Sequence, residues 1–179
     1  TVCCGAGNNG GDGYVLAKLA KIAGLTVDLY AMTDIANLKG AAAKAAKDAV
    51  AAGVKIKLFS SPIAFHTELI VDALLGSGLN DQVRSPYVEA IEAINAADAK
   101  VVSLDVPSGI DVDRGSMHGC AVSAALTVTF IALKQGLFTN KAPAYCGEII
   151  SHDLNIPKMV FEKFPTNVNL LQSDSLKSL

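Results

Sequence analysis

Short apolar runs alternate with longer amphipathic segments along most of the chain. The apolar runs, several of which end at glycine or proline, are typical of strands in a buried sheet. We expect seven strands, at residues 1–4, 25–31, 54–59, 68–73, 100–106, 126–131 and 147–152. The pattern weakens from residue 157 on, where we expect a surface tail.

Three of the segments between these runs have the periodicity of helices. In the first, Val15, Leu19 and Ile22 share one face, which we expect to pack into the core. The second, residues 41–52, is rich in alanine, the residue with the highest helix propensity. The third opens at Ser85, which we expect to act as an N-cap.

This alternation of strands and helices predicts an α/β fold. Strands joined by helices form a parallel sheet that is covered on both faces. Right-handed crossovers then give a Rossmann-like, three-layer αβα domain with a doubly wound, mostly parallel sheet. In that topology the third, second and first strands run to one side, and the fourth and fifth run to the other. Ligands bind between the first and fourth strands, outside their carboxyl ends.

Composition narrows the function classes. The chain has 179 residues, of which 51% are hydrophobic, and a net charge of -2. This length and apolar content suit one domain with a substantial core. The nearly neutral charge gives no support for nucleic-acid binding. Because the chain lacks an uncharged apolar run of about 18 residues, we expect no membrane span.

Four cysteines are present, Cys3, Cys4, Cys120 and Cys146. None forms a C-x-x-C pair or lies at zinc-ligand spacing from a histidine, so we interpret all four as reduced structural residues. Reduced cysteines indicate an intracellular compartment, and we expect a cytoplasmic protein.

Three segments bring small polar and acidic residues to the expected crevice. They are GAGNNGGDG at residues 5–13, LLGSGL at 74–79 and LDVPSG at 104–109. Asp72 and Asp105 lie in or at the ends of apolar strands, where a carboxylate costs several kcal/mol unless it is paired, hydrogen-bonded or bound to a metal. Either aspartate alone is compatible with capping a loop. Two of them on adjacent strand ends, facing a glycine loop, favour a functional site.

Asn9, Asp72 and Ser108 offer only oxygen atoms as metal ligands. Oxygen sets suit hard cations and not zinc, and one carboxylate among neutral oxygens indicates an ion of low charge. The spacing of these residues does not decide by itself whether they bind an ion.

The first glycine loop also contains the pattern G-x-G-x-x-G, at Gly5, Gly7 and Gly10. This dinucleotide fingerprint needs an acidic ribose ligand about 20 residues later, and Asp28 lies in mid-strand instead of at a strand end. A second glycine turn at residues 76–78 fits a nucleotide-like ligand whose phosphates cross the crevice. No histidine near these segments suits hydride transfer.

Four stretches together resemble the YjeF N-terminal family, the NAD(P)H-hydrate epimerases. They are CGAGNNGGDG at residues 4–13, IVDALLGSGL at 70–79, VVSLDVPSGIDVDRG at 101–115 and LTVTFIALKQGL at 126–137. Ser77 stands where the family usually has threonine, which keeps the hydroxyl. A leading helical segment of the family is missing, and we expect an upstream part to have been removed. The family domain would cover residues 1–165, with a tail or linker at 166–179.

The resemblance implies a homodimer that binds a potassium ion through Asn9, Asp72 and Ser108. It also implies substrate contacts by two loops and by one strand end. These contacts are Asn8, Asn9, Gly10, Gly11, Asp12, Gly76, Ser77, Gly78, Leu79, Asn80, Asp81, Gln82 and Asp105.

The substrate that the resemblance implies is NADH or NADPH hydrated at carbon 6 of the nicotinamide ring (NADHX or NADPHX). The enzyme interconverts its R and S forms. Because inversion at that carbon requires proton transfer at its hydroxyl oxygen, we expect Asp105 to act as the acid/base, since burial raises a carboxyl pKa. Lys134 is equally compatible with a place near the ring and with a structural ion pair. The tail is compatible with a linker to a C-terminal dehydratase domain, as in bifunctional bacterial relatives, and with a frayed extension.

Two other functions remain open at this point. One is a non-catalytic YjeF-like dimerisation scaffold, which need not keep the full polar crevice. The other is an ordinary NAD-dependent dehydrogenase. The preference between NADHX and NADPHX is also open, because no residue that would exclude a 2′-phosphate can be identified.

Overall fold

A computed structural model of the chain describes residues 1–166 and 168–171. It contains one sheet of seven parallel strands in the order β3-β2-β1-β4-β5-β6-β7. The strands are β1 (Val2–Cys4), β2 (Leu29–Ala31), β3 (Ile56–Leu58), β4 (Leu69–Ala73), β5 (Lys100–Leu104), β6 (Leu126–Phe130) and β7 (Glu148–His152). The predicted α/β class and strand order are confirmed, and each strand starts or ends within a few residues of the predicted position.

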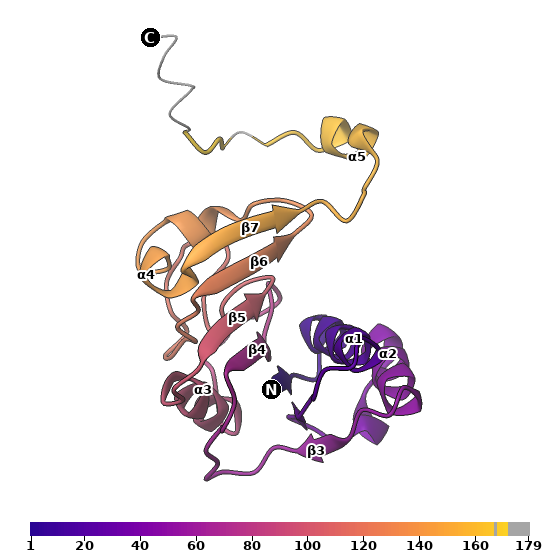
Figure 1. Cartoon of the computed structure of the whole chain (residues 1–179). Helices are drawn as coiled ribbons and strands as arrows, with labels where there is room; N and C mark the ends of the chain where they lie inside the picture. Colours follow the sequence, from indigo (N-terminus) through magenta and orange to yellow (C-terminus); the bar gives the residue numbers. More distant parts are fainter. Residues whose placement is uncertain (167, 172–179) are drawn as a thin grey trace.

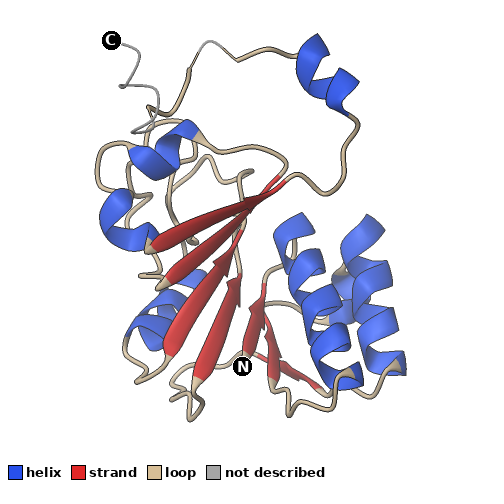
Figure 2. Cartoon of the chain, turned by 45° about the horizontal axis from the view of Figure 1, so that its top comes forward, coloured by secondary structure: helices blue, strands red, loops and turns tan. Residues whose placement is uncertain are grey.

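Helices cover the two sides of this sheet, and the last one lies beyond the final strand (Figure 1). They are α1 (Asn8–Ile22), α2 (Gly40–Ala51), α3 (Tyr87–Asn95), α4 (Pro143–Cys146) and α5 (Lys158–Lys163), with short 3-10 turns η1 (Ile35–Asn37) and η2 (Gln135–Phe138). Helices α1 and α2 lie together on one side, and α3 and α4 lie on the other. Figure 2 shows the strands fanning out as one twisted sheet between these layers.

The central strand β1 explains the layering. Cys3 and Cys4 are both fully buried and face opposite sides of the sheet, so they belong to different apolar cores. The core under α1 and α2 includes Tyr14, and the core under α3 includes Ile91. A third core around Leu137 lies under the loops that follow β5 and β6. A strand buried on both faces reads as a continuous apolar run, which is why the sequence pattern located it.

The predicted inner face of α1 is wrong. Val15, Leu19 and Ile22 are 45%, 59% and 66% exposed, while the buried positions of the helix include Gly13 and Ala17. A Cβ on Gly13 would lie only 2.6–2.7 Å from neighbouring side chains of β4 and β1. The helix therefore approaches the sheet through small residues, a packing that a search for large apolar residues does not detect.

The predicted cap of α3 is also different in the structure. Pro86 takes the N-cap position, and the Ser85 hydroxyl donates to the Glu89 carboxylate at 2.6 Å instead of accepting from a backbone N–H. Among the described residues, no helix is both long and apolar enough to cross a membrane. Most of the predicted tail, residues 167 and 172–179, lies outside the residues that the structure describes.

Candidate functional site

The crevice lies where β1 and β4 end side by side, as the register of Cys4 with Ala73 requires. A cavity of about 470 Å³ opens there, lined by the loop after β1, by residues 74–79 after β4 and by Tyr87. A second cavity of about 470 Å³ adjoins it, lined by Phe130 at the end of β6, by residues 131–134 after it and by Leu154. The two cavities share three residues of their walls, Asp12, Ser77 and Asp105.

Asp72 lies beneath this crevice and is fully buried. Its two carboxylate oxygens accept four hydrogen bonds, from the Leu74 N–H at 3.2 Å, the Ser103 hydroxyl at 2.8 Å, the Ser108 N–H at 2.9 Å and the Ser108 hydroxyl. Burial raises the pKa of Asp72, and the four hydrogen bonds oppose that rise. The carboxylate thereby ties the end of β4 to β5 and to the loop after β5.

Asn9 carries an unsatisfied polar atom beside this carboxylate network. Its Nδ2 donates to the Leu75 carbonyl at 3.0 Å, while its Oδ1 is buried and has no hydrogen-bond partner. This donation fixes the orientation of the amide, because a flipped amide would place two oxygens against each other. A buried orphan oxygen is costly unless something binds it.

The oxygens of Asn9, Asp72 and Ser108 therefore fit a hard cation of low charge. Asn9 Oδ1 is free to ligate, and Asp72 brings one buried negative charge. The Ser108 hydroxyl is already engaged, since it accepts from the Leu75 N–H at 2.9 Å and donates to Asp72. The structure brings the three residues together, because Asn9 and Ser108 both donate to the Leu75 carbonyl and Ser108 also donates to Asp72. That they bind an ion stays a prediction.

Asp105 follows β5 in a left-handed backbone conformation, with φ of 66°. Its Oδ1 pairs with Lys134 Nζ at 2.6 Å, and its Oδ2 accepts from the Ser77 N–H at 3.3 Å. Lys134 also donates to the Thr129 hydroxyl at 2.9 Å and to the Phe130 carbonyl at 2.7 Å. Lys134 thus forms the ion pair with Asp105 and also lines a cavity, and its place near the ring stays a prediction.

Asp12 projects from α1 and lines both cavities together with Asp105. Its carboxylate makes no hydrogen bond or ion pair with any residue in the described part of the chain. Although it is exposed to solvent in the cavities, the protein removes enough of its hydration to raise the pKa of Asp12, and the negative charge of Asp105 raises it further.

Not all of the predicted substrate contacts line the cavities. Gly10 and Gly11 instead allow close packing. A Cβ on Gly10 would lie 2.0 Å from the Gly5 carbonyl oxygen, and one on Gly11 would lie 3.3 Å from Ala42 Cα. The three residues Asn80, Asp81 and Gln82 also lie outside both cavity walls.

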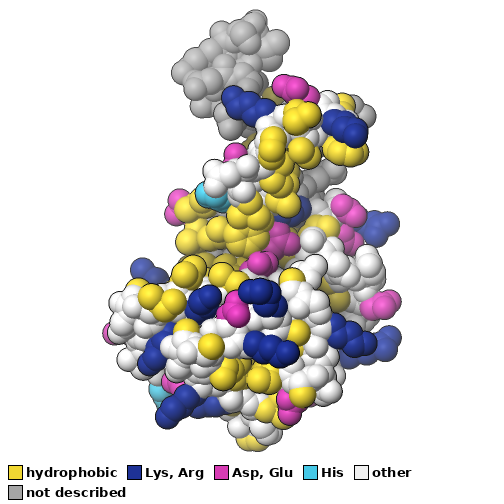
Figure 3. Space-filling model, turned by 90° about the vertical axis from the view of Figure 1, so that its right-hand side faces the viewer, with side chains coloured by type: hydrophobic (Ala, Val, Ile, Leu, Met, Phe, Trp, Pro, Cys, Tyr) yellow, Lys and Arg dark blue, Asp and Glu magenta, His cyan; other side chains and the backbone are white. Residues whose placement is uncertain are grey.

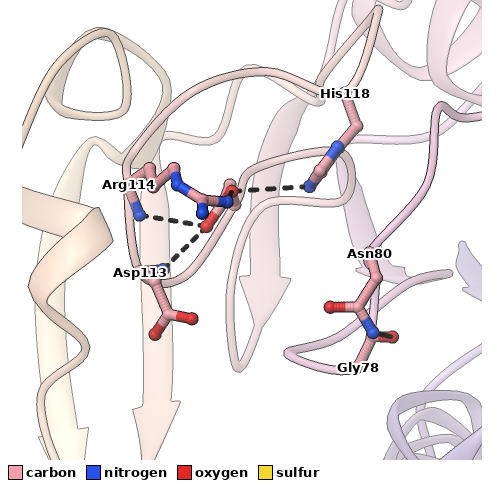
Figure 4. Close-up of polar contacts among 6 residues, drawn as sticks. Gly78, Asn80, Asp113, Arg114 and His118 are labelled. Carbon is pink, nitrogen blue, oxygen red and sulfur yellow. Dashed lines mark hydrogen bonds and ion pairs between the residues drawn. The ribbon is translucent and has the colours of Figure 1, made fainter.

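The loop that carries Asn80 is held from outside the crevice. The Asn80 side chain donates to the Gly78 carbonyl at 3.3 Å, and Figure 4 shows it across from His118. The nearby Asp111 carboxylate accepts from the Arg114 N–H at 3.0 Å and lies 3.8 Å from His118 Nε2. The Val83 N–H donates to the His118 carbonyl at 2.9 Å, which joins the two loops.

Sequence reasoning missed several wall residues. The Tyr87 hydroxyl accepts from the Ala6 N–H at 3.3 Å and lines the first cavity. The apolar side of the second cavity comes from Phe130, Ile131 and Leu133. Nothing in the sequence distinguishes these residues from other residues of strands and helices. They reach the crevice only because of the order of the strands in the sheet.

Comparison with known proteins gives the family. The model of the family "YjeF-related protein N-terminus" matches residues 1–136. The chain belongs to this YjeF N-terminal family. It is 54% identical over 172 residues, 96% of its length, to the "Bifunctional NAD(P)H-hydrate repair enzyme Nnr" of Coxiella burnetii, and it covers 35% of that protein. It is 36% identical over 91% of its length to the "NAD(P)H-hydrate epimerase" of Rhodopirellula baltica, and it covers 68% of that protein.

Comparison with solved structures matches the fold. The crystal structure of the yeast protein ynu0 superposes with a TM-score of 0.77 at 22% identity, covering 97% of this chain and 74% of that one. At this identity the match shows a shared fold. This member of the YjeF N-terminal family spans about a third of the length of the bifunctional relatives that it matches.

Proposed function

We propose that this chain is an NAD(P)H-hydrate epimerase domain, which interconverts the R and S forms of NADHX and NADPHX. The observation that carries this proposal is the pair of joined cavities at the β1–β4 switch point, whose shared wall holds Asp12, Ser77 and Asp105. The names of the family relatives support it, because they include NAD(P)H-hydrate epimerases from several bacteria.

The loop after β1 and the start of α1 would hold the pyrophosphate of the substrate. The first backbone bond inside this turn runs from the Gly11 N–H to the Gly7 carbonyl, so the N–H groups of the residues between them are free to face a ligand. No acidic residue lies in the first turn of α1, and a helix N-terminus attracts anions. Gly76 and Gly78 would line the opposite wall.

The second cavity would hold the hydrated nicotinamide ring. Its wall combines apolar side chains, among them Phe130, with Asp105 and Lys134. Inversion at carbon 6 requires either loss of the hydroxyl to give an iminium or opening of the ring at the carbon–nitrogen bond, and both routes move a proton at the hydroxyl oxygen. Asp105 would exchange that proton, and its carboxylate, which pairs with Lys134, would stabilise positive charge on the ring.

We also propose potassium as the ion held by Asn9, Asp72 and Ser108. When bound, it would supply positive charge that offsets the buried carboxylate and attracts the substrate phosphates. Asn9 Oδ1 would be its readiest ligand, since this atom is buried without a partner.

The proposal extends to the setting of the domain. We infer a cytoplasmic homodimer without nucleic-acid or membrane partners, and a fused C-terminal dehydratase domain in the full-length protein. The bifunctional names of relatives, of which this chain covers about a third, support the fusion. Size-exclusion chromatography with light scattering would report the mass of the particle and test the dimer.

The test of the function follows the R form of NADHX by chromatography with and without the chain, in potassium buffer. We expect conversion to the S form well above the spontaneous rate, and a loss of about 10²–10⁴-fold in Asp105→Asn. Asp98→Asn, an exposed aspartate after α3, is the matched control. A folded chain that gives no acceleration would favour the scaffold, and hydride transfer to undamaged NAD would favour the dehydrogenase.

A further inference from the structure

Two carboxyl groups reach the joined cavities from different elements. Asp12 comes from α1 after the first strand, and Asp105 comes from the end of β5. Both line both cavities, and each is close enough to the other for the charge of Asp105 to raise the pKa of Asp12. A carbon that inverts its configuration between them would therefore be reached by two acid/base groups.

The two groups are held in different ways. Both oxygens of Asp105 are engaged, one by Lys134 Nζ at 2.6 Å and the other by the Ser77 N–H at 3.3 Å. The Asp105 carboxylate therefore accepts a hydrogen bond on each of its oxygens. Asp12 has no such partner among the described residues, so its carboxyl group is free to carry a proton and to rotate towards a ligand.

Resting on the proposed epimerase function, we propose that Asp12 is a second catalytic residue, which donates the proton to the departing hydroxyl while Asp105 receives the proton on the opposite face of the ring. Two carboxyl groups whose surroundings differ commonly divide the roles of acid and base in this way. The proposed site thereby contains a group for each face of carbon 6.

The step balances in atoms and electrons. Asp12 gives its proton to the hydroxyl on carbon 6, the carbon–oxygen bond breaks, and water leaves as the nitrogen lone pair forms the carbon–nitrogen double bond of the iminium. A water molecule then adds to the other face, and its proton passes to the Asp105 carboxylate. One proton has moved from Asp12 to Asp105 with no change of oxidation state, and solvent resets the pair.

The pH dependence follows from the groups that surround Asp12. The titratable side chains that share its cavity walls are Asp105 and Lys134 in one cavity, and Asp105 and Tyr87 in the other. Activity requires protonated Asp12, so the rate falls as pH rises through its pKa. Because burial and Asp105 both raise that pKa, the falling limb lies above the ordinary range of an aspartate.

The experiment compares pH–rate profiles of epimerisation for the wild-type chain, Asp12→Asn, Asp12→Glu and Asp105→Asn, with Asp98→Asn as the control. We expect kcat of Asp12→Asn to fall by about 10²–10⁴-fold, KM to change by less than about threefold, and the falling limb to disappear. Asp12→Glu retains a titratable acid and should recover part of kcat. In the residual activity of Asp105→Asn, the limb should move to lower pH, because the charge that raises the pKa of Asp12 is gone.

The outcomes separate this inference from the proposed function. A folded Asp12→Asn variant that keeps more than half of the wild-type kcat, or the same falling limb, overturns the role of Asp12 while the epimerase function stands. A rise in KM at unchanged kcat would reduce Asp12 to a binding residue. A wild-type chain that does not accelerate epimerisation overturns both.

Discussion

Asp72 shows at the scale of one residue how the crevice is built. It was identifiable in the sequence, because a carboxylate in an apolar strand needs a partner. Its partners were not, since the donors Ser103 and Ser108 come from β5 and the loop after it. The same limit applies to Asp105, whose pairing with Lys134 depends on β6 lying beside β5.

Replacement of Asp72 by asparagine should destabilise the chain by about 1–3 kcal/mol, because an amide NH2 would face donors that now meet a carboxylate oxygen. Ser103→Ala removes one donor and leaves the Asp72 carboxylate with the other three, so it should cost about 1 kcal/mol. Urea unfolding of both variants measures the difference. An Asp72→Asn chain as stable as Ser103→Ala would contradict this account of the buried network.

At the scale of elements, α1 is where sequence and structure differ most. The central strands β1 and β4 were located well, because burial on both faces favours an apolar run. The inner face of α1 was assigned to Val15, Leu19 and Ile22, but the helix packs through glycine, alanine and Tyr14. Its exposed residues contribute to a shallow third cavity of about 490 Å³ beside Phe130. Figure 3 shows hydrophobic side chains gathered between α5 and the α1–α2 pair on this side.

The two glycines that precede and follow the asparagines should behave differently when replaced by alanine. Gly10→Ala should destabilise the chain by about 3 kcal/mol or more, because its Cβ would lie 2.0 Å from a backbone oxygen. Gly7→Ala meets nothing within 4 Å and should change stability by less than about 0.5 kcal/mol. Thermal and urea unfolding measure the stability of both variants. Equal losses of stability in Gly10→Ala and Gly7→Ala would refute the packing role assigned to Gly10.

At the scale of the whole molecule, the strand order brings the site together. Asn9, Asp72 and Asp105 are far apart in sequence but meet because β1, β4 and β5 are neighbours. The doubly wound topology could be predicted, and with it the meeting of these residues. The apolar wall after β6 and the position of Leu154 beyond β7 could not, because no local pattern marks them.

Potassium should stabilise the folded chain if the buried oxygens bind it. At ten times the dissociation constant, binding adds about 1.4 kcal/mol to the free energy of unfolding, a rise of about 3–6 °C in melting temperature. The melting temperature should be higher in potassium chloride than in tetramethylammonium chloride, and this difference should vanish in Asn9→Ala. It should persist in Asn37→Ala, a control variant at an exposed residue of η1. A shift that persists in Asn9→Ala would place the ion elsewhere.

The central claim is that this crevice interconverts the two hydrate forms. The most direct measurement starts from pure S-form NADHX in potassium buffer and follows its approach to the R/S equilibrium at several chain concentrations. The account predicts a rate that rises in proportion to the concentration of folded chain, and an unchanged equilibrium ratio. A rate equal to the spontaneous one at every concentration would contradict it.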